Sequence, residues 1–265
     1  MLLIVDDQEI TPSMNVDDLV TLVRGPVDSE VVLVVRRIDG DESNEMTFRI
    51  VRAEIELPSV EWRLLDDDPQ TADIGYLRLT TFTERSGGEM RNAIQELMEG
   101  GALRFLLDLR GNPGGLVNSA VEIADLWLDG GVVLIEERAD GSQTKLEANA
   151  DPLAGDAPLV VVVDGGSASA SEILAGALRD NGRARLVGEK TFGKGSVQLI
   201  HELSDRSSLH VTNAQWFTPN HHQITGQGLA PDVLVEAGVD PLPEAIALLA
   251  ENAPTATASD TKTGD

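Results

Sequence analysis

The chain has 265 residues, 42% hydrophobic and 25% charged, which is long enough for one main domain with a substantial core and a smaller companion. Its formal net charge of −25 argues against nucleic acid as a partner, because a phosphate-binding surface needs clustered Lys and Arg. The absence of cysteine excludes disulfides and thiol chemistry, and no run of about eighteen apolar residues is present to span a membrane.

The first segment, residues 1–52, alternates strand-like and helix-like patterns. LLIV (2–5) and VVLVVRR (31–37) predict strands, residues 16–23 have the apolar spacing of a short helix, and MTFRIVR (46–52) predicts a strand paired with the second run. This order resembles the second half of a PDZ domain. The loop and strand of the first half, which would capture a substrate C-terminus by strand addition, have no counterpart here. We therefore expect a partial PDZ-like, β-rich module.

A connector over 53–73 leads into the main domain, which we place over 74–252. IGYLRLTTF (74–82) predicts its first strand, and GGEMRNAIQELMEGG (87–101) predicts a helix that stops at glycines. Residues 253–265 are of low complexity and are expected to be a disordered tail. No charged segment followed by an apolar one opens the sequence, so no signal peptide is expected in this chain.

A glycine turn separates a predicted buried strand, RFLLDL (104–109), from a predicted helix, VNSAVEIADLWL (117–128). Consecutive glycines allow backbone N–H groups to converge on one point, which suits an oxyanion or a phosphate. The sequence is not a Walker motif, because no lysine follows the glycines at the required spacing. A purely structural tight turn is an equally good interpretation of these residues.

A serine cluster follows the next buried strand, PLVVVVDG (158–165), and precedes an amphipathic helix over 171–182. Ser169 and Glu172 have the spacing of a capping box, so Ser169 has a purely structural interpretation as a helix cap. The two roles are compatible. A hydroxyl at a helix N-terminus lies beside free N–H groups and the positive end of the dipole, where a developing oxyanion is stabilised.

A lysine between two glycines, Lys194, follows in FGKGSVQ (192–198). In an extended segment Lys194, Ser196 and Gln198 would share one face. The chain has four lysines against sixteen arginines, so this lysine is conspicuous, although glycine-rich turns often carry solvated charges without a function.

Three motifs together resemble the carboxy-terminal processing, or tail-specific, proteases, a Ser/Lys peptidase family. They are DLRGNPGG (108–115), the stretch from GSASASE to GKGSVQ (166–198), and WFTPNHHQITGQGLAPDV (216–233). The resemblance implies an α/β, crotonase/Clp-like protease core, with a mixed sheet and flanking helices, preceded by the partial PDZ-like module. It also implies an extracytoplasmic location, in the periplasm or cell envelope.

The same resemblance assigns roles to five residues. Ser169 is the nucleophile, Lys194 the base and Gln198 the residue that orients the lysine, while the N–H groups of Ala170 and Gly115 form the oxyanion hole. A lysine amine in water has a pKa of about 10.4 and is charged at neutral pH, and burial disfavours the charged form. We therefore expect Lys194 to be substantially buried in the competent state.

The resulting hypothesis is a serine endopeptidase that cleaves proteins near their C-termini through an acyl-enzyme intermediate. It needs no cofactor or metal, and its partners are proteins or peptides with accessible C-termini, not nucleic acid; a homo-oligomer is left open. The alternative is a catalytically silent binding or scaffold protein with the same fold, since fold does not decide function.

Histidines are the main rival for catalysis. His201, His210, His221 and His222 offer a Ser-His-Asp triad or metal ligands in principle, but none has the spacing of a helical zinc motif. His201 lies three residues beyond Gln198 on a predicted strand, and therefore on the opposite face.

Overall fold

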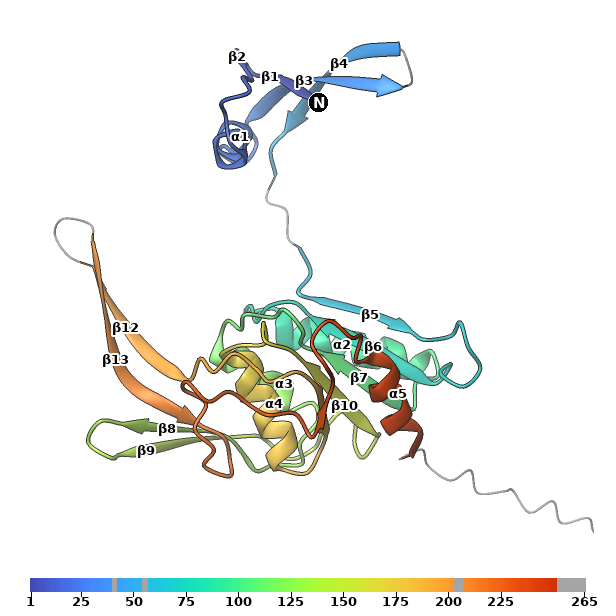
Figure 1. The fold of residues 1–265 in the computed structure, drawn as a ribbon, viewed down its shortest axis with the longest axis vertical. Coiled ribbons are helices and arrows are strands. Elements are labelled where there is room, and N and C mark those ends of the chain that lie inside the picture. The colour runs from blue at the N-terminus through green and yellow to red at the C-terminus, as the bar shows by residue number, and fades with distance from the viewer. Residues whose placement is uncertain (40–41, 54–56, 203–206, 252–265) are drawn as a thin grey trace, which may run out of the picture. The chain divides into compact units, whose positions relative to one another are not determined.

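The computed structural model describes residues 1–39, 42–53, 57–202 and 207–251 (Figure 1). It divides the chain into two compact units, Met1–Leu57 and Pro58–Asp265. Within the described residues, no helix is long and apolar enough to cross a bilayer.

The first unit is a small antiparallel sheet with one short helix among its described residues. The strand order is β2-β1-β3-β4. Helix α1 begins after Asn15, whose side chain accepts the Asp18 N–H at 3.0 Å while the Asp18 carboxylate accepts the Asn15 N–H. The predicted strands and helix are confirmed, whereas their assignment to a PDZ domain stays a prediction. The elements are β1 (Leu2–Val5), β2 (Gln8–Glu9), α1 (Val16–Val23), β3 (Glu30–Asp39) and β4 (Glu42–Val51).

The second unit is built on a mixed sheet. Among its described residues the strand order is β14-β11-β10-β7-β6-β5, with β5 antiparallel to β6 and all other neighbours parallel. The central strands are continuous apolar runs because helices cover both of their faces. The strands are β5 (Val60–Leu64), β6 (Ile74–Leu79), β7 (Arg104–Asp108), β10 (Leu159–Val163), β11 (Arg185–Gly188) and β14 (Val233–Leu234).

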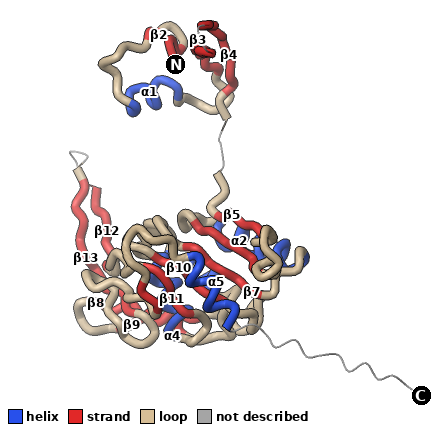
Figure 2. The backbone as a smooth tube through the Cα atoms, turned by 45° about the vertical axis from the view of Figure 1, so that its right-hand side comes forward, coloured by secondary structure: helices blue, strands red, loops and turns tan. Residues whose placement is uncertain are grey.

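The two faces of this sheet carry different helices. Along β7, Phe105 and Leu107 belong to the larger core with α2 (Ser86–Glu99), α3 (Val117–Ala124) and α4 (Ala170–Asp180). Leu106, on the other face, belongs to a smaller core with α5 (Leu242–Glu251), which Figure 2 shows lying across β10 and β7. The predicted α/β core with a mixed sheet and flanking helices is confirmed.

One predicted helix is shorter than expected. Helix α3 ends at Ala124 rather than continuing to Leu128. The carbonyl of Leu126 accepts the Ala154 N–H at 3.1 Å, and that of Trp127 accepts the Arg183 guanidinium at 2.9 Å. Residues 125–128 continue as a hydrogen-bonded turn, in which the N–H groups of Trp127 and Leu128 donate to the Ala124 carbonyl at 3.0 and 2.9 Å. The carbonyls that a helix end leaves free are thus bonded by distant segments.

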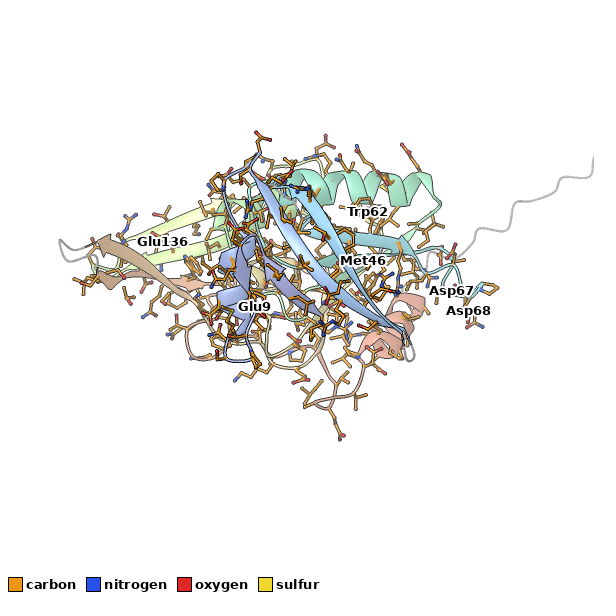
Figure 3. The ribbon with its side chains drawn as sticks, turned by 90° about the horizontal axis from the view of Figure 1, so that it is seen from above. Glu9, Met46, Trp62, Asp67, Asp68 and Glu136 are labelled. Carbon is orange, nitrogen blue, oxygen red and sulfur yellow. The ribbon has the colours of Figure 1, made fainter. Side chains whose placement is uncertain are left out.

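A second sheet forms an arm beside the core. Its order is β12-β13-β8-β9, and Figure 1 shows both hairpins extending to the same side of the unit. One of these hairpins is the antiparallel pair of β8 and β9. At the β5 edge of the six-stranded sheet, Trp62 lies beside α2, where its indole N–H donates to Glu96 at 3.3 Å (Figure 3). The arm strands are β8 (Val132–Arg138), β9 (Gln143–Glu147), β12 (Ser196–Glu202) and β13 (Ser208–Phe217).

A partly buried ion pair fixes the amino end of β7. Arg104, which is 6% exposed, donates to both carboxylate oxygens of Asp73 and to the Gln70 carbonyl. The hydrogen bonds from Arg104 hold the pKa of Asp73 below its usual value. A carboxylate with a lowered folded-state pKa stabilises the fold at neutral pH, and that stability is lost as the pH falls through the lowered pKa.

We predict that Asp73→Asn lowers the free energy of unfolding by about 2 kcal/mol at pH 7, because a desolvated guanidinium loses its counter-charge. The difference between wild type and variant should shrink as the pH falls below about 4, because Asp73 of the unfolded wild type then takes up a proton while folded Asp73, with its lowered pKa, is still charged. Urea unfolding of both proteins at several pH values measures this difference in the free energy of unfolding. A difference that stays constant down to pH 3 would contradict the assignment.

Candidate active site

Three loops of the candidate site leave the same edge of the sheet. The glycine loop follows β7, the serine turn follows β10, and the lysine loop follows β11. These strands are parallel neighbours, so their carboxyl ends meet, and clefts at such ends commonly hold functional groups. Topology thus brings together segments that are far apart in the sequence.

Ser169 is the N-cap residue of α4 and is 8% exposed. Its N–H donates to Glu172 Oε2 at 3.0 Å, and its carbonyl accepts the Glu172 N–H at 2.9 Å. Ser169 and Glu172 thus form the predicted capping box. The predicted cap position is correct, and within the described residues the Ser169 hydroxyl is the donor in no hydrogen bond, which leaves its proton available for chemistry.

The backbone of Ser169 is strained. Its φ of 57° and ψ of −116° match the first central position of a type II′ turn, which glycine normally occupies. Holding another residue there costs roughly 1–3 kcal/mol, and such strain persists where the surroundings enforce it. A strained serine between a buried strand and a helix is an observation that points to function.

The neighbouring serines are structural. Ser167 Oγ donates to the Leu109 carbonyl at 2.8 Å, and Ser171 Oγ donates to the Asn112 carbonyl at 2.9 Å. Both side chains are fully buried. They fasten the serine turn to the glycine loop on either side of Ser169, whose own hydroxyl donates no hydrogen bond within the described residues.

The glycine loop touches the serine turn at Gly114. A Cβ on Gly114 would lie 2.7 Å from Ser169 Cβ and 2.6 Å from the Ala168 carbonyl oxygen, and its φ is +97°. Gly115 is required for a different reason, because a Cβ there would lie 2.1 Å from the Phe82 carbonyl oxygen. Sequence reasoning singled out Gly115 and missed that the close approach to Ser169 belongs to Gly114.

Two N–H groups face this junction without a partner. Within the described residues, neither the Ala170 N–H nor the Gly115 N–H makes a hydrogen bond, while the Gly114 N–H donates to Asn112 Oδ1 at 2.9 Å. Ala170 is the first helical residue of α4, where free donors and the helix dipole favour negative charge. The arrangement suits a developing oxyanion.

A buried carboxylate joins the serine turn to the lysine loop. Glu172 is fully buried, and among the described residues it accepts four hydrogen bonds. The donors are the N–H groups of Ser169, Gly193 and Lys194, at 3.0, 2.7 and 2.8 Å, and the Thr191 hydroxyl at 2.5 Å. The sequence indicated Glu172 only as a cap, and nothing local signals its contacts beyond α4.

Lys194 lies in the loop between β11 and β12. Its N–H shares Glu172 Oε2 with the N–H of Ser169, so the backbones of the two residues meet at one oxygen atom. Its side chain is exposed, and the burial expected for the competent state is not present here. The flanking residues, Gly193 and Gly195, have no side chains that would cover the amine.

Gln198 lies on β12 opposite Thr212, and its side chain falls outside what the structure describes. Since Lys194 precedes β12, strand alternation does not relate its side chain to that of Gln198. The shared face of the two residues therefore stays a prediction.

A polar network anchors the glycine loop from the other side. Buried Asp108 accepts the Tyr76 hydroxyl at 2.8 Å and three hydrogen bonds from the Arg110 side chain, and Arg110 also pairs with Asp240 at 3.0 Å. Burial, reinforced by the Asp108 carboxylate, raises the pKa of Tyr76 to about 12. The Asp and Arg of the DLRG motif are thus occupied in holding β7 to the segment before α5.

The structure describes the side chains of two of the four histidines, His221 and His222. His222 Nε2 is 2.8 Å from the Gly228 carbonyl oxygen, and no group of three or more His, Cys, Asp or Glu residues there is arranged for a metal ion. The side chains of His201 and His210 lie outside the described residues.

Comparisons with known proteins show the family to which the chain is similar. The model of Peptidase family S41 matches residues 73–235. The carboxyl-terminal-processing protease of Synechocystis sp. is 42% identical over 226 residues, which are 85% of this chain and 52% of that protein. Carboxyl-terminal-processing peptidase 3, chloroplastic, of Arabidopsis thaliana is 40% identical over 224 residues, 82% of this chain and 43% of that protein.

Among solved structures, the photosystem II D1 C-terminal processing protease matches with a TM-score of 0.63 and 32% identity, covering 94% of this chain and 66% of that one. The chain spans about half the length of the curated relatives it matches.

We predict that Ser169→Gly is more stable than Ser169→Ala by about 1 kcal/mol, because relief of the strained backbone exceeds the entropy cost of glycine. Both variants lack the hydroxyl, so the comparison isolates the backbone. Urea unfolding of the pair measures the difference. Equal stability, or a more stable alanine variant, would show that Ser169 is not strained.

Proposed function

Because the chain belongs to peptidase family S41, we propose that it is a serine endopeptidase that cleaves proteins near their C-termini, with Ser169 as nucleophile and Lys194 as base. The observation that carries the proposal is the convergence of the two residues, whose N–H groups meet at one oxygen of Glu172. The strained backbone of Ser169 supports the same assignment.

In the proposed reaction the neutral Lys194 amine takes the proton of the Ser169 hydroxyl, and the resulting alkoxide attacks a peptide carbonyl. Collapse of the tetrahedral intermediate releases the leaving amine, which takes the proton back from the ammonium, and water then hydrolyses the acyl-enzyme. The exposed amine has to lose water to work as a base. We propose that the bound substrate covers Lys194, and that Gln198 orients it.

The N–H groups of Ala170 and Gly115 are proposed to bind the oxyanion. Their lack of partners in the described residues supports this role, as does the position of Ala170 at the start of α4. Gly114 keeps the two donors together through its contact with Ser169.

The proposed substrates are proteins or peptides with accessible C-termini, and the proposed setting is outside the cytoplasm. The proposed organisation keeps the partial PDZ-like module over 1–52, the connector over 53–73 and the protease core over 74–252. The other candidate is a catalytically silent scaffold with this fold. It is less well supported, because it does not explain why the backbone of Ser169 is strained.

Cleavage of casein by wild type, Ser169→Ala and Lys194→Ala tests the proposal. We expect wild type to cleave and both variants to be inactive while melting within about 3 °C of wild type, since a single surface or cap change costs little stability. A fluorophosphonate probe should label wild type at Ser169. Cleavage by Ser169→Ala at the wild-type rate would remove the mechanism, and folded wild type that neither cleaves nor labels would favour the scaffold.

We predict that Gly114→Ala lowers kcat by about 100-fold, because the new Cβ displaces the oxyanion donors, and loss of one such donor costs that much. Gly111→Ala is the matched control. It changes a glycine of the same loop that has a positive φ and nothing within 4 Å of its added Cβ. The prediction is wrong if the two variants lose the same activity.

A further inference from the structure

The Glu172 carboxylate has no capacity left for chemistry on a substrate. A carboxylate is a pure acceptor with about four lone-pair sites, and four donors occupy them. Oε2 accepts the N–H groups of Ser169 and Lys194, and Oε1 accepts the Gly193 N–H and the Thr191 hydroxyl. Within the described residues Glu172 makes no ion pair with a cation, so these donors and the start of α4 compensate its buried charge.

Thr191 extends this connection to the third sequence motif. Its hydroxyl donates to Glu172 and accepts the Leu229 N–H at 2.7 Å, while its own N–H donates to the Leu229 carbonyl at 3.0 Å. The side chain is 5% exposed. One buried hydroxyl therefore links the helix that carries the serine to the segment around Gly228, which packs against the lysine loop.

We infer that Glu172 and Thr191 are positioning residues for the Ser/Lys pair: they set the distance between the two reacting side chains by holding both backbones on one carboxylate. This inference rests on the proposed function. Gly193 and Gly195 give the lysine loop no side chains to pack, so its placement depends on such backbone contacts. Lys194 is held by its N–H, and in this scheme its exposed side chain turns toward Ser169.

Replacement by glutamine should not preserve the arrangement. An amide nitrogen donates, so whichever oxygen of Glu172 it replaces, two of the four donors lose their acceptor. Displacement of the base by about 1 Å is enough to cost about 100-fold in rate. The loss should fall on kcat, since neither residue contacts the substrate in this scheme.

The experiment compares Glu172→Gln, Thr191→Val and Thr191→Ser with wild type in the full chain. We measure kcat and KM on casein, labelling of Ser169 by a fluorophosphonate, melting temperature, and hydrogen exchange of the Lys194 and Ser169 amides. Asp73→Asn is the control for lost stability, because its carboxylate lies at the amino end of the strands.

We expect Glu172→Gln to lower kcat by about 100-fold and Thr191→Val by about 10-fold, with KM within about 3-fold of wild type. Exchange of the Lys194 and Ser169 amides should accelerate, because their acceptor is lost. Thr191→Ser, which keeps the hydroxyl, should restore the wild-type rate, and Asp73→Asn should lose stability without losing rate.

Wild-type rates in Glu172→Gln and Thr191→Val, or a folded Thr191→Ser as impaired as Thr191→Val, would overturn the inference. Unchanged amide exchange in Glu172→Gln would overturn it as well, even if the variant were inactive. Failure of the proposed function is a separate result, since wild type itself would then neither cleave casein nor react with the probe.

Discussion

The buried carboxylate of Glu172 is the constraint around which the described site is arranged. It is the third residue of α4, so it caps the helix that begins at Ser169, and it also accepts hydrogen bonds from the lysine loop. A buried charge without these donors would cost several kcal/mol. The donors therefore have to stay together for the core to be stable, and keeping them together is what brings Ser169 to Lys194.

The parallel strands bring the three loops of the site to the same edge of the sheet. The registers of β7, β10 and β11 align Asp108 with Val162 and Val163 with Gly188, so the three loops start at one level. At this edge the ion pair of Asp108 and Arg110 holds the start of the glycine loop. Phe82 holds its end, because the Phe82 N–H donates to the Gly114 carbonyl at 3.0 Å. A rigid frame of this kind is what allows a strained Ser169 and two unbonded N–H groups to persist.

Local sequence patterns were sufficient to predict the strands and helices of the core, but not the contacts between the loops that connect them. Continuous apolar runs predicted β7 and β10, and the spacing of Ser169 and Glu172 predicted the start of α4, because these features depend on near neighbours. The approach of Gly114 to Ser169 and the loop contacts of Glu172 depend on residues far away in the chain. Such contacts leave no periodic signal, and a capping glutamate looks the same with or without them.

The exposed side chain of Lys194 shows that two requirements for a lysine base, which the sequence does not distinguish, are met separately. A lysine base has to be placed near the serine, and it has to be removed from water. In this structure the backbone contacts to Glu172 meet the first requirement, while the amine remains solvated. We propose that a bound substrate meets the second requirement by covering the amine. In that scheme the cost of desolvating the lysine comes out of substrate binding, and the folded protein does not have to carry it.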